Sequence, residues 1–331
     1  MKRAIMSLTL PLGIGIILSF PGCTLERNAV RRVCIIERPS ELSTHIDIDS
    51  FMSCHEEESD QPRTITIWIH GTMLFSSTIF QSIFNSKEQL KHFSELPRNY
   101  SLYTIASTLI SNAPYIFIAK DFYVFGWSGH LSFAEREKAA QCLYEEINSL
   151  CDRYIQINKK RPKIRLITHS HGGNVALNIA KIIPHMDTHF AIDQLILLAC
   201  PVQDHTKDLI HHPIFKQCYS LYSRLDLMQI IDPQGIYGPS GFFRSHFLSE
   251  RCFPLNDRLH QIKIRMNRRA ITHSEFTMPP FLEQLAVILN EIDVWRQQKS
   301  FYGNKKMGVK HLLSLETHLL SPTKKRSRRN A

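Results

Sequence analysis

Short apolar runs alternate along the chain with longer segments in which apolar residues recur at helical spacing. The short runs, rich in β-branched residues, predict strands, and they cover residues 64–69, 121–125, 163–168, 194–199, 218–222 and 261–266. The longer segments predict helices over residues 131–154, 175–183 and 281–295. Regular alternation of the two elements predicts an α/β fold, with a mostly parallel central sheet covered by helices on both faces.

Composition divides the 331 residues into four parts. Residues 1–23 are expected to form a signal peptide, and residues 24–61 a polar leader with an acidic cluster. Residues 62–300 contain all the predicted strands and helices and are long enough for one large domain. Residues 301–331 form a basic tail. We therefore expect one α/β domain flanked by two segments of different character.

The N-terminus has the order of an export signal. A basic start precedes an apolar stretch that ends in small residues before Cys23. The position of Cys23, directly after Gly22, resembles the processing site of bacterial lipoproteins, in which the cysteine is lipidated. We therefore expect a protein exported to a bacterial cell envelope and anchored to the membrane through Cys23. The alternative is an uncleaved anchor, for which a stretch of about 17 residues is marginal.

The formal net charge of +10 is concentrated at one end of the chain. Residues 303–331 contain eight lysines and arginines and the single acidic residue Glu316, which leaves the rest of the protein nearly neutral. A nucleic-acid partner is therefore not indicated for the domain. The tail either contacts an anionic surface such as membrane lipid or is only a solvated end.

Apart from Cys23, the cysteines are scattered, at positions 34, 54, 142, 151, 200, 218 and 252. They are odd in number and lack the paired spacing of a zinc site or of a disulfide framework, although one pair could form in an oxidising compartment. Most are expected to be small buried apolar groups. The sequence therefore predicts neither a metal nor a cofactor.

The most informative motif is Ile-Arg-Leu-Ile-Thr-His-Ser-His-Gly-Gly at residues 164–173. An apolar strand ends at Ser170, two glycines follow, and a helix begins, which is the pattern of a nucleophile elbow. Gly172 and Gly173 suit a turn too tight for larger side chains. Thr168 stands where the usual G-x-S-x-G motif has glycine, so an ordinary glycine-rich turn is the alternative.

A serine nucleophile needs a base to take its proton and an acid to hold that base. In open α/β sheets these groups gather beyond the carboxyl ends of the strands, here in the order Ser, Asp, His. Asp226 follows one predicted strand and His273 follows the last one. Asp204 is the alternative acid, and Asp232 lies six residues beyond Asp226.

The segment after the first predicted strand suits an oxyanion hole, a pair of N–H groups that bind the developing negative charge. This segment begins His70-Gly71-Thr72, and its glycine lets the backbone turn toward the nucleophile. The first donor is then the N–H of Thr72 or Met73, and the second is the N–H of His171. His70 is expected to bond loop backbone rather than to transfer protons.

These motifs, together with Gly-Trp-Ser-Gly after the second strand, resemble the α/β-hydrolase superfamily over residues 62–297. More narrowly, the chain resembles bacterial lipase- and esterase-like serine hydrolases. The resemblance implies an α/β-hydrolase fold that works without a cofactor. The implied roles are Ser170 as nucleophile, Asp226 and His273 as its catalytic partners, Thr72 and His171 as oxyanion donors, and His70, Gly71, Trp127 and Gly172 as supporting residues, with Trp127 walling the site.

The expected reaction is hydrolysis of a carboxylic ester, with a lipid or acyl ester as substrate. Residues 73–84 and 235–253 are apolar enough to form an acyl pocket or a lid, and equally suit loops packed on the core. An amidase or thioesterase would use the same groups, because the acyl chemistry is shared. A catalytically inactive surface or interaction protein on the same fold is the remaining alternative.

Overall fold

The structure is a computed structural model that describes residues 6–9, 15–18, 32–34, 62–72, 88–183, 190–231, 251–254, 257–301 and 312–317. The chain divides into two units, Met1–Val30 and Arg31–Ala331. In the first unit, β1 (Met6–Thr9) and β2 (Gly15–Leu18) pair as antiparallel strands. Within the described residues, no helix is both long enough and apolar enough to cross a membrane.

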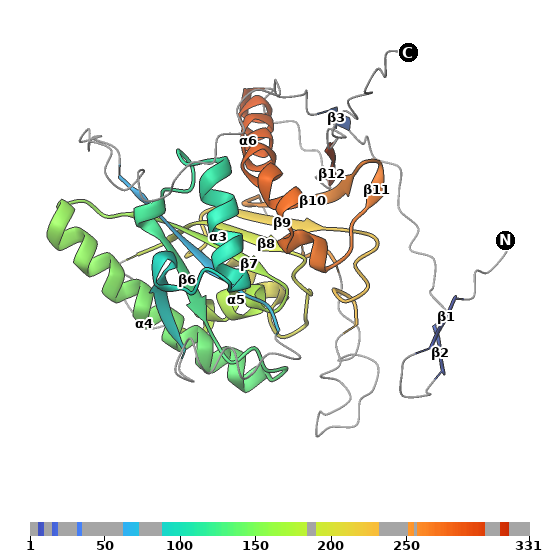
Figure 1. The fold of residues 1–331 in the computed structure, drawn as a ribbon, viewed down its shortest axis with the longest axis horizontal. Helices are drawn as coiled ribbons and strands as arrows, with labels where there is room; N and C mark the ends of the chain where they lie inside the picture. Colours follow the sequence, from blue (N-terminus) through green and yellow to red (C-terminus); the bar gives the residue numbers. More distant parts are fainter. Residues whose placement is uncertain are drawn as a thin grey trace, which may run out of the picture. The chain divides into compact units, whose positions relative to one another are not determined.

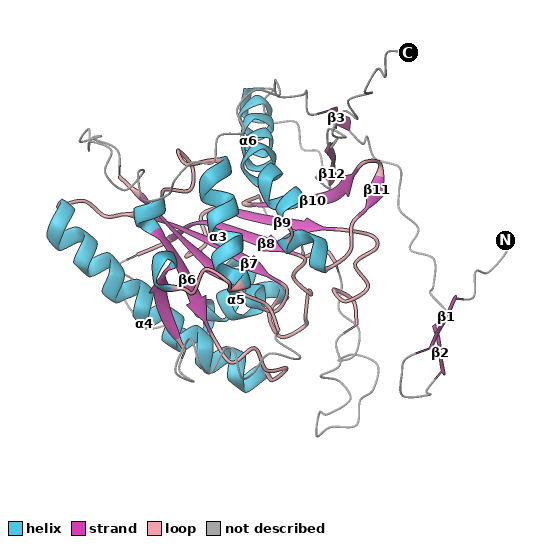
Figure 2. Ribbon diagram, in the orientation of Figure 1, coloured by secondary structure: helices cyan, strands magenta, loops and turns pink. Residues whose placement is uncertain are grey.

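The second unit is built on one large sheet, drawn as arrows in Figures 1 and 2. Its described strands run in the spatial order β3-β12-β10-β9-β8-β7-β4-β6-β5, and all the pairs along this path are parallel except β5 with β6. The short β11 pairs antiparallel with β10. The strand bounds are β3 Arg32–Cys34, β4 Thr64–Ile69, β5 Gln89–His92, β6 Phe122–Gly126, β7 Lys163–His169, β8 Ile192–Leu198, β9 Cys218–Tyr222, β10 Leu259–Met266, β11 Arg269–Ala270 and β12 Leu312–Thr317.

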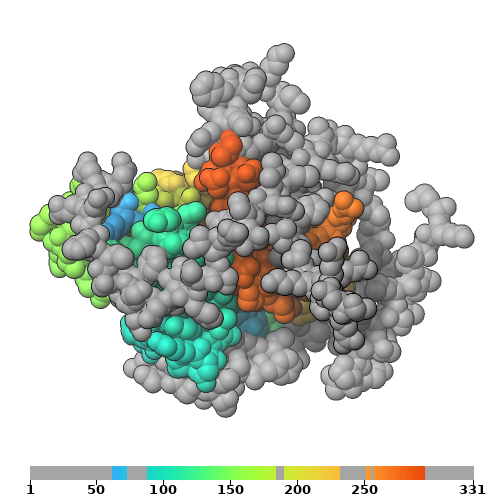
Figure 3. All heavy atoms as spheres, turned by 45° about the horizontal axis from the view of Figure 1, so that its top comes forward, coloured from blue at the N-terminus to red at the C-terminus, as the bar shows by residue number. Residues whose placement is uncertain are grey.

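Helices cover both faces of the sheet (Figure 2). One face packs against α3 (Ser101–Asn112) and α6 (Pro279–Phe301), which contact each other and adjoin in the space-filling view of Figure 3. The other face packs against α4 (Phe133–Asn158) and α5 (Gly172–Ile182). Four short 3₁₀ helices complete the described elements, η1 Phe93–Glu95, η2 Ala119–Asp121, η3 Lys207–His211 and η5 Ser274–Thr277.

Alternation along the strands explains the two cores. In β4, Ile67 and Ile69 point into the core under α4 and α5, whereas Trp68 points into the core under α3 and α6. Successive side chains of a strand face opposite sides, so a strand covered on both faces must be apolar almost throughout. This arrangement confirms the predicted fold class, a mostly parallel sheet with helices on both faces.

The six predicted strands are present as β4 and β6 to β10, with ends that differ by at most two residues. Helix α3 and strand β5 were not predicted. Strands β3 and β12 lie in segments assigned by composition to the leader and the tail, and β12 pairs with β10. The division into signal, leader, domain and tail stays a prediction. The five described cysteines, Cys142, Cys151, Cys200, Cys218 and Cys252, are free thiols.

Candidate active site

Ser170 occupies a strained turn between β7 and α5. Its backbone φ is 52°, in the left-handed region that L-residues other than glycine seldom adopt. Hydrogen bonds hold it there, because its N–H donates to the Leu198 carbonyl at 2.9 Å and its carbonyl accepts from the Gly173 N–H at 3.0 Å. Strained residues of this kind cluster at functional sites, where the surrounding structure maintains them.

Glycines allow the backbone of the turn to touch the end of β4. A Cβ on Gly172 would stand 2.5 Å from the His70 carbonyl oxygen and 2.6 Å from that of Ile69, too close for any side chain. A Cβ on Gly71 would stand 2.7 Å from the Cβ of Ser170. The residues after β4 therefore lie directly beside the serine.

Thr168 fits the turn although the common motif has glycine there. Its side chain is fully buried, and its hydroxyl donates a hydrogen bond to the Ile196 carbonyl of β8 at 3.2 Å. Burying a hydroxyl group that keeps a hydrogen-bond partner costs little free energy of folding. The departure from the motif is thus accommodated in the sheet and leaves the position of Ser170 unchanged.

The structure brings Asp226 and His273 into contact from the ends of β9 and β10. The His273 Nδ1 lies 3.0 and 2.9 Å from the two carboxylate oxygens of the fully buried Asp226. The Gln229 N–H donates to the same carboxylate at 2.9 Å. Because Nδ1 faces a carboxylate it carries the proton, so Nε2 keeps the lone pair that a base requires.

Asp204, the alternative acid, does not share this position. Asp204 forms an exposed ion pair with Lys207 at 2.6 Å, and its side chain is 62% accessible to solvent. Asp232 lies outside the described residues. Among the candidates that the structure describes, Asp226 is therefore the acid that meets His273.

His169 connects the Asp226–His273 pair to the turn at Ser170. Its Nε2 donates to the His273 carbonyl at 3.1 Å, and the two imidazole rings lie 4.6 Å apart between centroids. No hydrogen bond joins Ser170 Oγ to His273 within the described part of the chain. In structures without substrate such bonds are often long and tighten only in the reacting complex.

Two backbone N–H groups border the serine. His171 immediately precedes α5, and helix amino ends leave their N–H groups without intrahelical partners. The second group belongs to Thr72, which follows the Gly71 that touches Ser170. Among the described residues neither N–H donates a hydrogen bond, so both remain able to bind an anionic oxygen.

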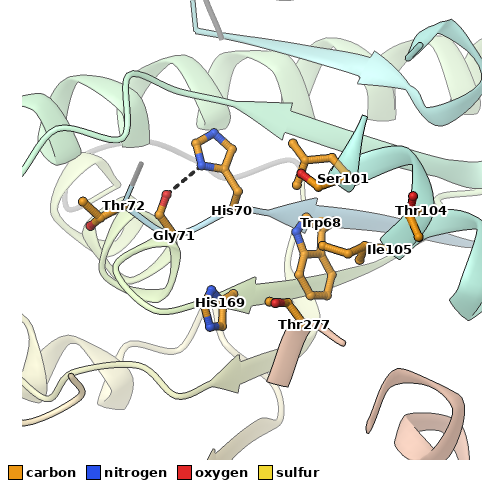
Figure 4. A pocket seen from close by; sticks show the side chains of 10 residues that line it. Trp68, His70, Gly71, Thr72, Ser101, Thr104, Ile105, His169 and Thr277 are labelled. Carbon is orange, nitrogen blue, oxygen red and sulfur yellow. Dashed lines mark hydrogen bonds between the residues drawn. The ribbon is translucent and has the colours of Figure 1, made fainter. Parts of the chain in front are cut away.

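His70 and Trp127 support the loop after β4. His70 Nδ1 donates to the Gly71 carbonyl at 2.7 Å, as drawn in Figure 4, and its Nε2 accepts from the Trp127 N–H at 3.2 Å. Burial lowers the pKa of His70 to about 4, so the imidazole is neutral. The Trp127 ring stacks on His70 and its Nε1 donates to the His70 carbonyl at 2.8 Å. Trp127 braces His70 and is not among the residues that line the adjacent cavity. The expectation that it walls the site stays a prediction.

A cavity of about 340 Å³ opens beside the turn, between the ends of β4 and β7, the start of α3 and the 3₁₀ helix η5 (Figure 4). His169, Gly71 and Thr72 contribute to its wall, as does Trp68. Burial, with the His273 ring as a second cause, lowers the pKa of His169 to about 3. Its neutral ring donates from Nε2, so Nδ1 is an acceptor on the Gly71 side.

Sequence reasoning missed Trp68 and His169 as site residues. Trp68 occurs within a strand-forming run, a pattern that by itself indicates only a core position. The one signal for His169 was its position next to Ser170. Trp68 and His169 both reach the cavity, because their strands end at the edge of the sheet where the turn at Ser170 begins.

Several expectations concern residues outside those that the structure describes, including Cys23, Met73 and most of the two apolar segments proposed as lids. Phe253 is described and is buried in the core with α4 and α5, so it belongs to the core. Burial also places the pKa of His171 well below its usual range. Among the described residues, no group of three or more histidine, cysteine or acidic side chains is placed so that it could hold a metal ion.

Comparison with families of known sequences gives no match, and neither does comparison with curated proteins. Among solved structures, an esterase from Pyrobaculum calidifontis is 13% identical, covering 73% of this chain and 79% of its own, with a TM-score of 0.34. The rice cell wall degrading esterase LipA from Xanthomonas oryzae is 11% identical, covering 81% and 77%, with a TM-score of 0.31. Similarity this low carries no information about substrate, so any function must rest on the residues of the site.

Proposed function

We propose that this protein is a serine hydrolase that cleaves carboxylic esters, with Ser170, His273 and Asp226 as its catalytic triad. The observation that carries the proposal is the contact of His273 Nδ1 with the buried Asp226 carboxylate, on the same sheet edge as a serine held at a positive φ. A strained serine alone would fit any tight turn. A buried carboxylate that orients a histidine toward that edge is what acyl transfer requires.

The chemistry follows from the positions of the protons. His273 Nε2 takes the proton of Ser170 Oγ while the oxygen bonds to the ester carbonyl carbon. Negative charge then develops on the carbonyl oxygen, which the N–H groups of His171 and Thr72 bind. His273 returns its proton to the departing alcohol as the carbon–oxygen bond breaks. Water repeats the sequence on the acyl-enzyme and releases the acid.

Asp226 acts on the base and not on the substrate. Its carboxylate fixes the imidazole orientation and stabilises the positive charge that His273 gains when it takes the proton. The neutral His70, His169 and His171 add no positive charge nearby, because burial lowers the pKa of each of them. Asp226 is thus the acidic group in direct contact with the base.

A fluorophosphonate probe tests the proposal, because it reacts with an activated serine hydroxyl. We expect labelling of the wild-type protein and none in Ser170→Ala or His273→Ala. Ser128→Ala is the matched control, since Ser128 also follows a strand and lies beside glycine but donates to Glu135 at 3.1 Å. Folded wild-type protein that fails to react would rule out the proposal.

The competing proposal is a non-catalytic surface or interaction protein on the same fold. The observation in its favour is that Ser170 and His273 share no hydrogen bond among the described residues. It predicts no probe labelling and no hydrolysis of esters, amides or thioesters. A panel of these three acyl classes also separates an esterase from an amidase or thioesterase, which would use the same triad.

We also propose export to a bacterial cell envelope and membrane attachment through a lipid on Cys23. Support comes only from the order of basic, apolar and small residues before that cysteine, and the basic tail would add attraction to anionic lipid. Metabolic labelling with a tagged fatty acid should mark the wild type and not Cys23→Ser. Cys142→Ser is the control, and an unlabelled wild type would contradict lipidation.

A further inference from the structure

We propose that the cavity beside Ser170 recognises an oxygen atom of the substrate through the indole N–H of Trp68. The preferred substrates are then short esters that carry a hydroxyl group close to the scissile bond, and not plain alkyl esters. This inference rests on the proposed hydrolase function and narrows it from acyl esters in general to hydroxylated ones.

Trp68 carries a buried hydrogen-bond donor without an acceptor. Its side chain is 1% exposed, and its Nε1 has no hydrogen-bond partner among the residues that the structure describes. The equally buried Trp127 differs, because its Nε1 donates to the His70 carbonyl at 2.8 Å. An unpaired buried donor costs the folded protein about as much as a lost hydrogen bond. Such a group in a native structure calls for an explanation, and a ligand is one.

The position of this donor points to the ligand. Trp68 lines the cavity, and Figure 4 shows its indole nitrogen at the end of the ring nearer to His70 and Ser101 than to Thr277. Gly71, the neighbour of Ser170, lines the same cavity. A group that enters it therefore belongs to the part of the substrate next to the reacting carbonyl.

The cavity also offers acceptors. His169 Nδ1 has no partner among the described residues, and it can only accept because Nε2 donates to the His273 carbonyl. The hydroxyl of Thr72 is likewise buried and has no partner within the described residues. A hydroxyl group on the substrate both accepts and donates, so it suits a cavity with one unpaired N–H and unpaired acceptors.

Charge and size exclude other ligands. The lining residues include apolar Leu102 and Ile105 and contain no lysine or arginine, so a carboxylate would be buried without a counter-ion. A plain alkyl group would leave the Trp68 N–H unpaired. The volume of about 340 Å³ lies at the lower end of the range of ligand pockets, which favours a short group over a long acyl chain.

The test compares esters that differ only in the hydroxyl group. On the acyl side, p-nitrophenyl 3-hydroxybutyrate is compared with p-nitrophenyl 3-methylbutyrate, in which a methyl group replaces the hydroxyl at similar volume. On the alcohol side, 2-hydroxypropyl acetate is compared with isobutyl acetate, in which a methyl group again replaces the hydroxyl. We expect a preference in kcat/KM of about tenfold or more for the hydroxylated member of one pair, because the alkyl member leaves buried polar groups unpaired.

Trp68→Phe removes the N–H and keeps an aromatic ring. We expect the preference to fall by about three- to tenfold, the value of one hydrogen bond. Tyr100→Phe is the matched control, because the Tyr100 hydroxyl is also buried without a partner in the same core cluster but does not line the cavity. That variant should keep the wild-type preference.

A binding measurement separates failure of this inference from failure of the proposed function. In ¹⁵N-labelled Ser170→Ala protein, the indole N–H signal of Trp68, assigned by its loss in Trp68→Phe, should move downfield with methyl 3-hydroxybutyrate and not with methyl 3-methylbutyrate. If the protein is labelled by the probe and hydrolyses esters but shows neither the preference nor the shift, the inference is overturned and the proposed function stands. Protein that shows the shift but no labelling or hydrolysis overturns the hydrolase and leaves the hydroxyl site.

Discussion

The two edges of the sheet differ in backbone strain and in the hydrogen bonding of their polar side chains. At the carboxyl edge, Ser170 and Ala199 have positive φ values of 52° and 53°, and the Trp68 N–H is buried without a partner. At the amino edge, a cavity of about 290 Å³ is lined by charged and amide side chains from the starts of β4, β7, β8 and β9. None of the residues lining that second cavity has a buried polar side-chain atom without a hydrogen bond.

Charge alone therefore does not identify a reactive edge. At the amino edge, Arg165 donates to the Gln194 side chain and the Ile116 carbonyl, and the Asp193 carboxylate accepts from the Ile164 N–H. Those groups satisfy one another. The carboxyl edge instead keeps strain and unpaired polar atoms, which persist in native proteins mainly where a function uses them.

The largest expected effect concerns the acid at the carboxyl edge. Asp226→Asn should lower kcat for ester hydrolysis by a factor on the order of 10³–10⁴, because an amide no longer holds His273 in the tautomer with Nε2 free. Asp204→Asn is the matched control and should leave kcat within about twofold, since its surface ion pair is worth little. Steady-state kinetics of both variants measures these changes, and equal losses of kcat would contradict the assignment of Asp226 as the acid.

The strained turn predicts the next largest effect. Gly172→Ala should destabilise the protein by about 3 kcal/mol or more, because the new Cβ meets two backbone carbonyl oxygens that cannot move separately. Gly173→Ala should cost less, about 1–3 kcal/mol, because its Cβ meets the side chain of Cys200. Urea unfolding measures both, and the reverse order would show that the turn is not held against β4.

The buried His70 predicts a pH effect. Its pKa of about 4 in the folded protein lies below the value of 6.5 expected when unfolded, so the unfolded chain binds the proton first as the pH falls. The stability that neutral His70 contributes is fully present above pH 6.5 and is lost progressively as the pH falls from 6.5 to 4, up to about 3 kcal/mol.

Urea unfolding at pH 7.5, 6.5 and 5.5 measures this effect. The free energy of unfolding should decrease below pH 6.5 in the wild type and decrease less in His70→Asn, whatever the absolute stability of that variant. His169 and His171 shift in the same direction and leave part of the decrease in place. Identical slopes in the two proteins would show that His70 is not held neutral by the fold.

The core strands and the turn at Ser170 were predictable because the pattern of neighbouring residues determines them. A run such as β4 is almost entirely β-branched and is buried on both faces, and Ser170 with its glycines marks a sharp turn. Helix α3 was not predictable in this way, because serine and threonine occupy many of its positions. These residues favour helix caps and turns over helix interiors. In the structure, Ser107 and Thr108 bond back to the Thr104 carbonyl.

The parts of the site that escaped prediction depend on partners distant in sequence. Asp226 and Asp204 both follow strands, and only the fold decides which of them meets His273. Trp68 and Trp127 are both buried tryptophans, and their difference is whether a carbonyl lies opposite the indole N–H. Nothing in the pattern of one sequence encodes such a pairing.

The smallest expected effect lies at the amino edge and tests whether that edge is only structural. The Lys216 ammonium is exposed and has no hydrogen-bond partner within the described part of the chain. Lys216→Ala should therefore change the free energy of unfolding by no more than about 0.5 kcal/mol and leave ester hydrolysis unchanged. Asp193→Ala, at the same cavity, should cost about 1 kcal/mol, because the Ile164 N–H loses its acceptor. Loss of activity in Lys216→Ala would contradict the comparison, since it would couple this charged edge to the chemistry at the other.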